Sequence, residues 1–181
     1  MNITSCPLSK SPNPDKAKKL YISAFPKYER LPWWVLRFLT LNKIANITCY
    51  YADGEFCGFT YDVITHNILY LMFFAVKEEL RGKGYGSAIL EYLKKNNPDK
   101  AITLNIELID SAAENAAERV RRIEFYKKNG FFDTNHNIDE VGGTFRVLST
   151  KAELDKEAYL KAFTGITLGL WRPKITKLDN N

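Results

Sequence analysis

The sequence has few cysteines and histidines, the residues that build disulfide frameworks and many metal sites, and it has no long apolar run. Its 181 residues include only three cysteines and two histidines, and Cys6, Cys49 and Cys57 lack the spacing of metal ligands. An odd number of cysteines without that spacing favours reduced thiols, as in the cytoplasm. The apolar run Ile68–Val76 is too short for a helix that spans a membrane, so we expect no membrane partner.

The sequence predicts a single, mildly basic domain without a secretory leader. We expect no secretory leader, because Met1–Cys6 is polar and Pro7, Pro12 and Pro14 interrupt any apolar run. We expect one domain over residues 1–181, since no long linker or internal repeat divides the chain. The formal net charge of +5 is a mild basic bias, which suits an anionic ligand and does not by itself indicate a nucleic-acid partner.

The most informative segment leads from the apolar run Ile68–Val76 through three alternate glycines into an amphipathic pattern. Gly82, Gly84 and Gly86 permit unusual φ values and leave the backbone amides open to a ligand. A helix should follow, because apolar residues recur on one face before Pro98. Its N-terminus would present unpaired N–H groups, for which a phosphate or pyrophosphate is the expected ligand. A tight strand-to-helix connection without a ligand would explain the glycines equally well.

The glycine spacing differs from that of the two common phosphate loops. The loop of nucleotide triphosphatases needs a hydroxyl residue after its lysine, and Lys83 is followed by Gly84; the dinucleotide fingerprint needs a third glycine where Ile89 stands. Arg81–Gly86 instead resembles the Arg/Gln-x-x-Gly-x-Gly/Ala signature of the GNAT superfamily of acetyl-coenzyme A dependent N-acetyltransferases. Glu78 stands where these proteins often have proline.

A second segment is similar to the same family. Glu124–Phe132 resembles the family's helix end, Tyr-x-x-x-Gly-Phe, with Tyr126 as the tyrosine. Gly130 suits the left-handed cap of a helix, and Phe131 begins a new apolar run. The two motifs occur in the family's order, and the resemblance covers roughly residues 45–148.

The expected elements give a mixed α/β fold. Helices are expected at 15–25, 32–41, 85–97, 116–128 and, from a capping box at Thr150–Glu153, through Phe163. Strands are expected at 46–51, 56–64, 68–76, 101–107, 131–133 and 144–149, with a final extended segment at 165–175. The resemblance implies a GNAT-like central sheet, flanked by helices and splayed open after the strand Ile68–Val76.

A hairpin is expected at Asp53-Gly54. A two-residue turn there would place Cys49 opposite Gly58 and Cys57 opposite Tyr50. The two cysteines would then face opposite sides of the sheet, which disfavours a disulfide.

The resemblance also implies where acetyl-CoA, the acetyl donor, would bind. Backbone groups of Phe74, Ala75 and Val76 would hold the pantetheine arm. The amides of the loop would bind the pyrophosphate, through Arg81, Gly82, Lys83, Gly84, Tyr85, Gly86 and Ser87. The Arg81 side chain would assist by contacting phosphate, or would instead pair with Glu78 or Glu79.

Acyl transfer from a thioester to an amine needs an uncharged amine, a polarised carbonyl and a stabilised thiolate. The Val76 amide is the candidate carbonyl donor. Tyr126 matches the family's tyrosine near the sulfur and would hydrogen-bond or protonate the thiolate; a core aromatic beside Phe125 is the alternative. Glu107 is the candidate base, which would receive an amine proton directly or through water, or would bind a cationic substrate; an ordinary strand-end carboxylate explains it as well.

The remaining polar candidates are less directly tied to the chemistry. His66, in an expected turn, and His136, in an expected polar loop at 133–140, should be solvated. Arg119 stands where the family often has an asparagine seven residues before the tyrosine, with Asn115 one turn earlier on the same helix face. This helix face would contact the cofactor, with Arg119 and Arg122 reaching phosphate or an acidic substrate, or the arginines would simply face solvent; the sequence supports both equally.

The function predicted from these residues is transfer of an acetyl group from acetyl-CoA to a primary amine of a small molecule. Acetylation of a protein amino group or a charged tRNA is one alternative, and a CoA-binding regulatory protein without catalysis is another. Trp33 and Trp34 cannot both face one side of a helix, so core packing or a homodimer contact explains them better than an amine pocket.

Overall fold

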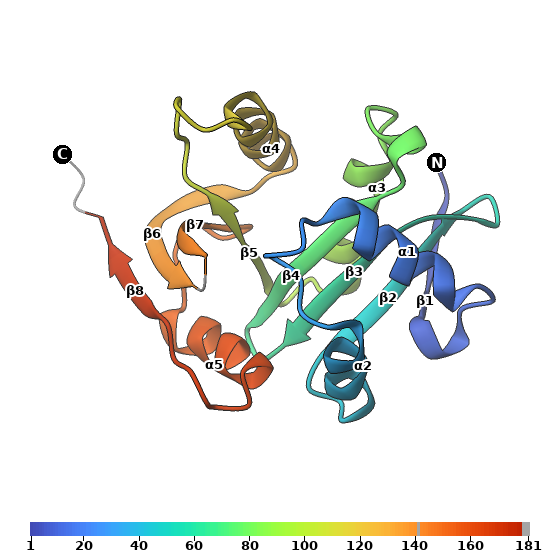
Figure 1. Ribbon diagram of the computed structural model, residues 1–181, viewed down its shortest axis with the longest axis horizontal. Coiled ribbons are helices and arrows are strands. Elements are labelled where there is room, and N and C mark those ends of the chain that lie inside the picture. The colour runs from blue at the N-terminus through green and yellow to red at the C-terminus, as the bar shows by residue number, and fades with distance from the viewer. Residues whose placement is uncertain (141, 179–181) are drawn as a thin grey trace. The chain divides into compact units, whose positions relative to one another are not determined.

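The computed structural model describes residues 1–140 and 142–178 (Figure 1). The chain divides into two compact units, the first formed by Met1–Val63 and Leu71–Pro98, the second by Ile64–Tyr70 and Asp99–Asn181. Strand β4 (Ile68–Val76) has exactly the expected bounds and contributes to both units. In the part of the chain that the structure describes, no helix is long and apolar enough to cross a membrane. The expectation of a single domain over residues 1–181 stays a prediction.

In the described residues, the first unit combines an antiparallel meander with three α-helices and two short 3-10 helices. Its strands follow the hydrogen-bonded order β1-β2-β3-β4. Its elements are β1 (Ile3–Pro7), η1 (Leu8–Lys10), α1 (Pro14–Ala24), α2 (Trp33–Leu41), β2 (Asn46–Ala52), most of β3 (Glu55–Ile64), the end of β4, η2 (Glu78–Leu80) and α3 (Tyr85–Asn96). The α-helices and strands from α1 to α3 lie within one or two residues of the expected bounds, whereas the sequence does not predict η2.

Strand β1 is not predicted by the sequence, because its residues are mostly polar and it ends in proline. It pairs antiparallel with β2, from Ile3 opposite Ala52 to Pro7 opposite Thr48. Proline has no N–H to donate, which suits the end of a strand at a sheet edge. The pairing, rather than any local pattern, therefore creates this strand.

The β2–β3 hairpin turns at Asp53-Gly54 as expected, with positive φ values of 50° and 82° at the two residues. A bulge next to Tyr50 then shifts the register, so that Tyr50 lies opposite Gly58 and Cys49 opposite Phe59. The expected pairing of Cys49 with Gly58 is wrong by one residue, because the length of a turn does not reveal a bulge beyond it. All three cysteines are free thiols.

An aromatic cluster forms the core between α1 and the strands of the first unit. The ring of Tyr21 lies 5.1 Å from that of Phe73, 5.7 Å from that of Trp33 and 6.2 Å from that of Phe59. Trp33 therefore belongs to this core, as core packing predicts, whereas Trp34 is exposed.

The second unit continues the sheet in the order β4-β5-β7-β6-β8. Its elements are β5 (Ala101–Glu107), α4 (Ala116–Lys128), β6 (Phe132–Glu140), β7 (Gly143–Ser149), α5 (Lys156–Ile166) and β8 (Lys174–Lys177). The β4–β5 ladder is parallel and pairs Ile68–Tyr70 with Ala101–Thr103, while the other ladders of this unit are antiparallel. The sheet is thus mixed, as expected for the α/β class.

Strand β6 contradicts the expected polar loop at 133–140. Thr134, His136 and Ile138 are buried in alternation, which is the period of a strand with one covered face. His136 is therefore not solvated, and burial lowers its pKa. The prediction failed because pairing with β7 and β8 stabilises a polar strand that its own residues do not favour. His66 is exposed, as expected.

Helix α5 begins later than expected. Its N-cap is Asp155, whose carboxylate accepts a hydrogen bond from the Ala158 amide at 3.0 Å. The expected capping box at Thr150 is wrong, because the Thr150 hydroxyl accepts from the Ile102 amide at 2.9 Å instead. The expected extended segment at 165–175 is also mostly wrong, since the strand there is β8 (Lys174–Lys177).

Gly58 supplies a test of the packing in the first unit. A Cβ atom at this position would lie 2.6 Å from the Ala75 carbonyl oxygen and 3.2 Å from Ile89 Cδ1. We expect Gly58→Ala to lower the free energy of unfolding by about 1–3 kcal/mol through overpacking. Denaturant unfolding measures this, with the exposed Glu55→Ala of the same strand as control, expected within about 0.5 kcal/mol of wild type. Equal stabilities of the two variants would contradict the close approach.

Candidate functional site

In the first unit the glycine loop has the backbone of an anion cradle. Gly82 and Gly84 have φ values of 72° and 86°, and Gly84 is the N-cap of α3. A Cβ atom built on either glycine meets no atom within 4 Å. These glycines are therefore needed for their positive φ values and not to make room for a neighbouring part of the chain. The surface of the loop is open.

The amides and charges of this loop suit an anion. The first-turn amides of α3, from Tyr85 to Ser87, have no carbonyl partner within the helix, and the helix dipole places partial positive charge there. Arg81 and Lys83 are exposed. Among the described residues Arg81 forms no ion pair, because Glu79 pairs with Lys77 instead. Neither alternative partner, Glu78 or Glu79, is thus ion-paired with Arg81 in the described residues, and its guanidinium is available to a phosphate.

The end of β4 leads into this loop. Ala75 is buried, whereas Phe74 and Val76, which share the opposite face of the strand, are half-buried. The Lys77 amide, directly after β4, donates to the Cys57 carbonyl of β3 at 3.0 Å and so ties the start of the loop to the neighbouring strand. Phe74 and Val76 are consequently the residues of this strand end with surface left to offer a ligand.

Tyr126 lies near the end of α4 in the second unit. Its ring packs against Phe125 at 5.2 Å and Phe131 at 5.4 Å, so only 9% of the residue is exposed. Burial raises the pKa of its phenol to about 12, and Arg122 opposes the shift. Within residues 1–140 and 142–178 its hydroxyl forms no hydrogen bond. Tyr126 thus packs as a core aromatic residue, and its protonated hydroxyl is a hydrogen-bond donor without an acceptor among the described residues.

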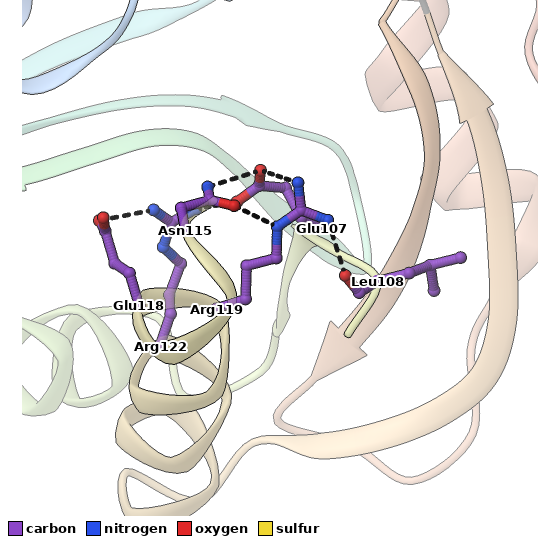
Figure 2. Close-up of polar contacts among 6 residues, drawn as sticks. All are labelled: Glu107, Leu108, Asn115, Glu118, Arg119 and Arg122. Atoms are coloured by element: carbon purple, nitrogen blue, oxygen red, sulfur yellow. Dashed lines mark hydrogen bonds and ion pairs between the residues drawn. The ribbon is translucent and has the colours of Figure 1, made fainter. Parts of the chain in front are cut away.

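Glu107 lies at the end of β5. Hydrogen-bond donors from α4 and from Asn115, the N-cap of that helix, surround its carboxylate (Figure 2). Its carboxylate forms ion pairs with Arg119 at 3.1 Å and with Arg122 at 2.9 Å. Asn115 donates to the same carboxylate at 3.2 Å and accepts from Arg119 Nε at 2.7 Å. The side chain of Glu107 is only 15% exposed, so these contacts are shielded from water.

This cluster explains why the sequence left the role of the arginines open. Both point toward Glu107, and Arg119 also donates to the Leu108 carbonyl at 2.9 Å (Figure 2). Only the fold brings Glu107 and α4 together, so the helix pattern alone does not reveal these partners. The assignment of Asn115 and Arg119 to cofactor binding, and of Glu107 to catalysis, stays a prediction.

The sequence also misses a second polar cluster in the same unit, formed by Tyr70, Asn105, Glu140 and Tyr159. Asn105 is bonded to the other three. No motif marks these residues, because they come from four separate elements. Of the residues that the structure describes, no group of histidine, cysteine, aspartate and glutamate could hold a metal ion.

The comparisons with known proteins agree with the fold and the loop. A family model described as an acetyltransferase (GNAT) domain matches residues 44–132, which include the glycine loop and Tyr126. No curated protein matches the sequence.

Solved structures share the fold at low sequence identity. A GNAT-family protein of Bacteroides thetaiotaomicron superimposes with a TM-score of 0.68 at 24% identity, covering 94% of this chain and 96% of that one. An aminoglycoside 6'-N-acetyltransferase complexed with coenzyme A gives 0.63 at 16% identity, covering 86% and 100%. The ribosomal-protein-S18-alanine N-acetyltransferase of Escherichia coli gives 0.56 at 18%, covering 84% and 96%. The fold is therefore the α/β GNAT fold, whose members act on different acceptors.

The Glu107 cluster gives a prediction on stability. Replacing Glu107 by alanine would leave the partly buried Arg119 guanidinium without its carboxylate and Arg122 with the exposed Glu118 alone, and we expect a loss of about 2–3 kcal/mol in unfolding free energy. Glu118→Ala is the matched control, because Glu118 pairs with the same Arg122 but is 59% exposed. It should cost less than about 1 kcal/mol. Denaturant unfolding of both variants measures the difference, and similar losses would contradict a structural role specific to Glu107.

Proposed function

Because this chain is a member of the GNAT acetyltransferase superfamily, we propose that it acetylates a primary amine of a small molecule by direct attack on acetyl-CoA. Coenzyme A supplies the acetyl group as a thioester. The free thiols of Cys6, Cys49 and Cys57 are compatible with action in the cytoplasm. The fold that this chain shares with an aminoglycoside N-acetyltransferase is compatible with a small acceptor.

The glycine loop would hold the pyrophosphate of the coenzyme. Its residues fit this group, since Gly82 and Gly84 leave the backbone uncovered and the amides of Tyr85 to Ser87 are free at the start of α3. Arg81 would add a charge-assisted hydrogen bond. Backbone groups of Phe74, Ala75 and Val76 would hold the pantetheine arm, with the Val76 amide as donor to the thioester carbonyl.

The observation that carries the proposal is the uncommitted phenol of Tyr126. With a pKa of about 12 it remains protonated at every pH at which the protein would work. Full proton transfer to a thiolate of conjugate pKa about 8.5 would be uphill by about 5 kcal/mol. Tyr126 therefore stabilises the departing sulfur as a hydrogen-bond donor, and the proton of the thiol comes finally from solvent.

For Glu107 we propose a structural role in place of the role of base. Its carboxylate already accepts hydrogen bonds from Asn115, Arg119 and Arg122, which tie it to α4 and to the residue that caps this helix. We assign the cluster to fastening the start of α4 to the end of β5, which keeps the helix that carries Tyr126 in place.

Arg81 provides a test of coenzyme binding. We expect Arg81→Ala to raise the Kd of coenzyme A about tenfold, because one charge-assisted contact to phosphate is lost. Lys95→Ala is the control, since it removes the same charge at the other end of α3 and should change the Kd by less than about twofold. Calorimetric titration at one ionic strength measures both, and equal effects would show general charge attraction instead of a site.

Tyr126 provides a test of catalysis. In Tyr126→Phe we expect kcat to fall about 100-fold, because one donor to the developing thiolate is lost, while the Kd of acetyl-CoA stays within about twofold. The assay is release of free thiol from acetyl-CoA against a panel of amines and peptides, with the exposed Tyr28→Phe as control. Activity should show no loss from Tyr126 ionisation below about pH 11, since its pKa is raised.

Two results would count against the proposal. If wild type binds acetyl-CoA but releases no thiol with any member of the panel, the chain is a coenzyme-binding protein rather than an enzyme. If peptides are acetylated and small amines are not, the acceptor is a macromolecule.

A further inference from the structure

Four side chains of the second unit meet around Asn105, which lies on β5. Asn105 Nδ2 donates to the hydroxyl of Tyr70 at 3.0 Å and to Glu140 Oε1. The hydroxyl of Tyr159, on α5, donates to Asn105 Oδ1 at 2.6 Å. All polar atoms of the amide group are thereby oriented, and Asn105 holds the Glu140 carboxylate in one place.

The Glu140 carboxylate has no cationic partner. No ion pair joins it to a lysine or arginine in the described chain, in contrast to Glu107, which pairs with two arginines. The groups that face it are Asn105 and the phenols of Tyr70 and Tyr159. A desolvated carboxylate without a counter-ion costs free energy, and burial raises the pKa of Glu140 to about 7. A bound cation would therefore stabilise the ionised form of this carboxylate.

The surroundings of Glu140 suit an organic cation rather than a metal ion. Tyr70 lies 5.5 Å from Tyr159 and 5.8 Å from Phe163, and the Phe163 ring lies 5.5 Å from Trp171. Tyr70 and Tyr159 are buried, whereas Glu140 and Trp171 are partly open to solvent. Aromatic faces attract ammonium groups and cover apolar carbon. No second carboxylate lies among these residues, which a divalent metal would favour.

We propose that Glu140 binds the ammonium group of the acceptor and removes its proton, with Asn105 as the positioning residue. Of the four aromatic rings named above, Trp171 has surface open to solvent and would contact the apolar body of the substrate. The inference rests on the proposed function and names its substrate class, a primary amine with an apolar or aromatic body. In the step, an N–H bond of the ammonium breaks and an O–H bond forms on Glu140. The nitrogen keeps the electron pair for its attack, and Glu140 returns the proton to solvent.

Equilibrium binding tests the site without turnover. The probe is phenethylamine, titrated into the full-length protein at pH 8 by calorimetry, with 2-phenylethanol as the neutral analogue. We expect Glu140→Gln, which keeps an oxygen for Asn105, to weaken phenethylamine binding at least tenfold. Binding of 2-phenylethanol should be equally weak in both proteins. The exposed Glu153→Gln is the control and should bind phenethylamine as wild type does.

Kinetics test the proton transfer. A carboxyl group with a raised pKa is a base above pH 7 and loses this ability as the pH falls through 7. For wild type, kcat/KM for the amine should therefore fall below pH 7, whereas the Glu140→Gln profile should lack this dependence. At pH 8 the variant should lose at least about 100-fold in kcat/KM with an unchanged Kd for acetyl-CoA. Tyr70 and Tyr159 do not titrate in this range, since burial raises their pKa values well above 10.

The outcomes separate this inference from the proposed function. If wild type fails to bind phenethylamine, or Glu140→Gln binds and acetylates it as wild type does, Glu140 is not the acceptor site. If wild type binds phenethylamine through Glu140 but releases no thiol from acetyl-CoA, the acetyltransferase proposal fails alone. Glu140→Asp keeps the charge and should bind the probe more tightly than Glu140→Gln. That rescue distinguishes loss of charge from a disturbed fold, which thermal unfolding of each variant also reports.

Discussion

A polar side chain on a half-buried face of a strand needs hydrogen-bond partners from other elements, because the backbone ladder of the sheet supplies none. Strand β5 carries two such side chains, two residues apart. Asn105 and Glu107 project from the same face of the strand. Glu107 takes its partners from α4, and Asn105 takes one from α5 through Tyr159. Both helices of the second unit are therefore fastened to a single strand by directional bonds. Apolar packing alone would fix their distance from the sheet but not their rotation about their own axes.

The two glutamates of this unit show how the environment divides similar groups between different tasks. Glu107 is shielded from water and paired with two guanidinium groups, so its charge stabilises the contact between β5 and α4. Glu140 is held by an amide and faced by phenols, so its charge is left for a ligand. A carboxylate that is already paired gains little from a substrate ammonium, whereas an unpaired one gains much. In the proposal made above, the candidate base is therefore Glu140 at the end of β6, in place of Glu107 at the end of β5.

Local signals in the sequence predict most elements correctly, and long-range pairing explains the exceptions. The bounds of β4, β5 and α4 follow from apolar runs, caps and glycines, and the glycine loop and Tyr126 are marked by motifs. Strand β1 and the polar strand β6 exist because neighbouring strands pair with them, which no local pattern contains. The partners of Glu107, and the cluster around Asn105, unite residues far apart in the chain. Their geometry arises only when the sheet forms.

The raised pKa of Glu140 also alters the charge of the whole molecule. The formal value of +5 treats every carboxyl group as ionised at pH 7, yet a group whose pKa is raised to about 7 is partly protonated there. The folded chain is therefore more positive than its composition implies. Unfolding at neutral pH would release this bound fraction of a proton, because the carboxyl returns to its ordinary acidity. The measured enthalpy of unfolding should consequently include the ionisation heat of the buffer that accepts it.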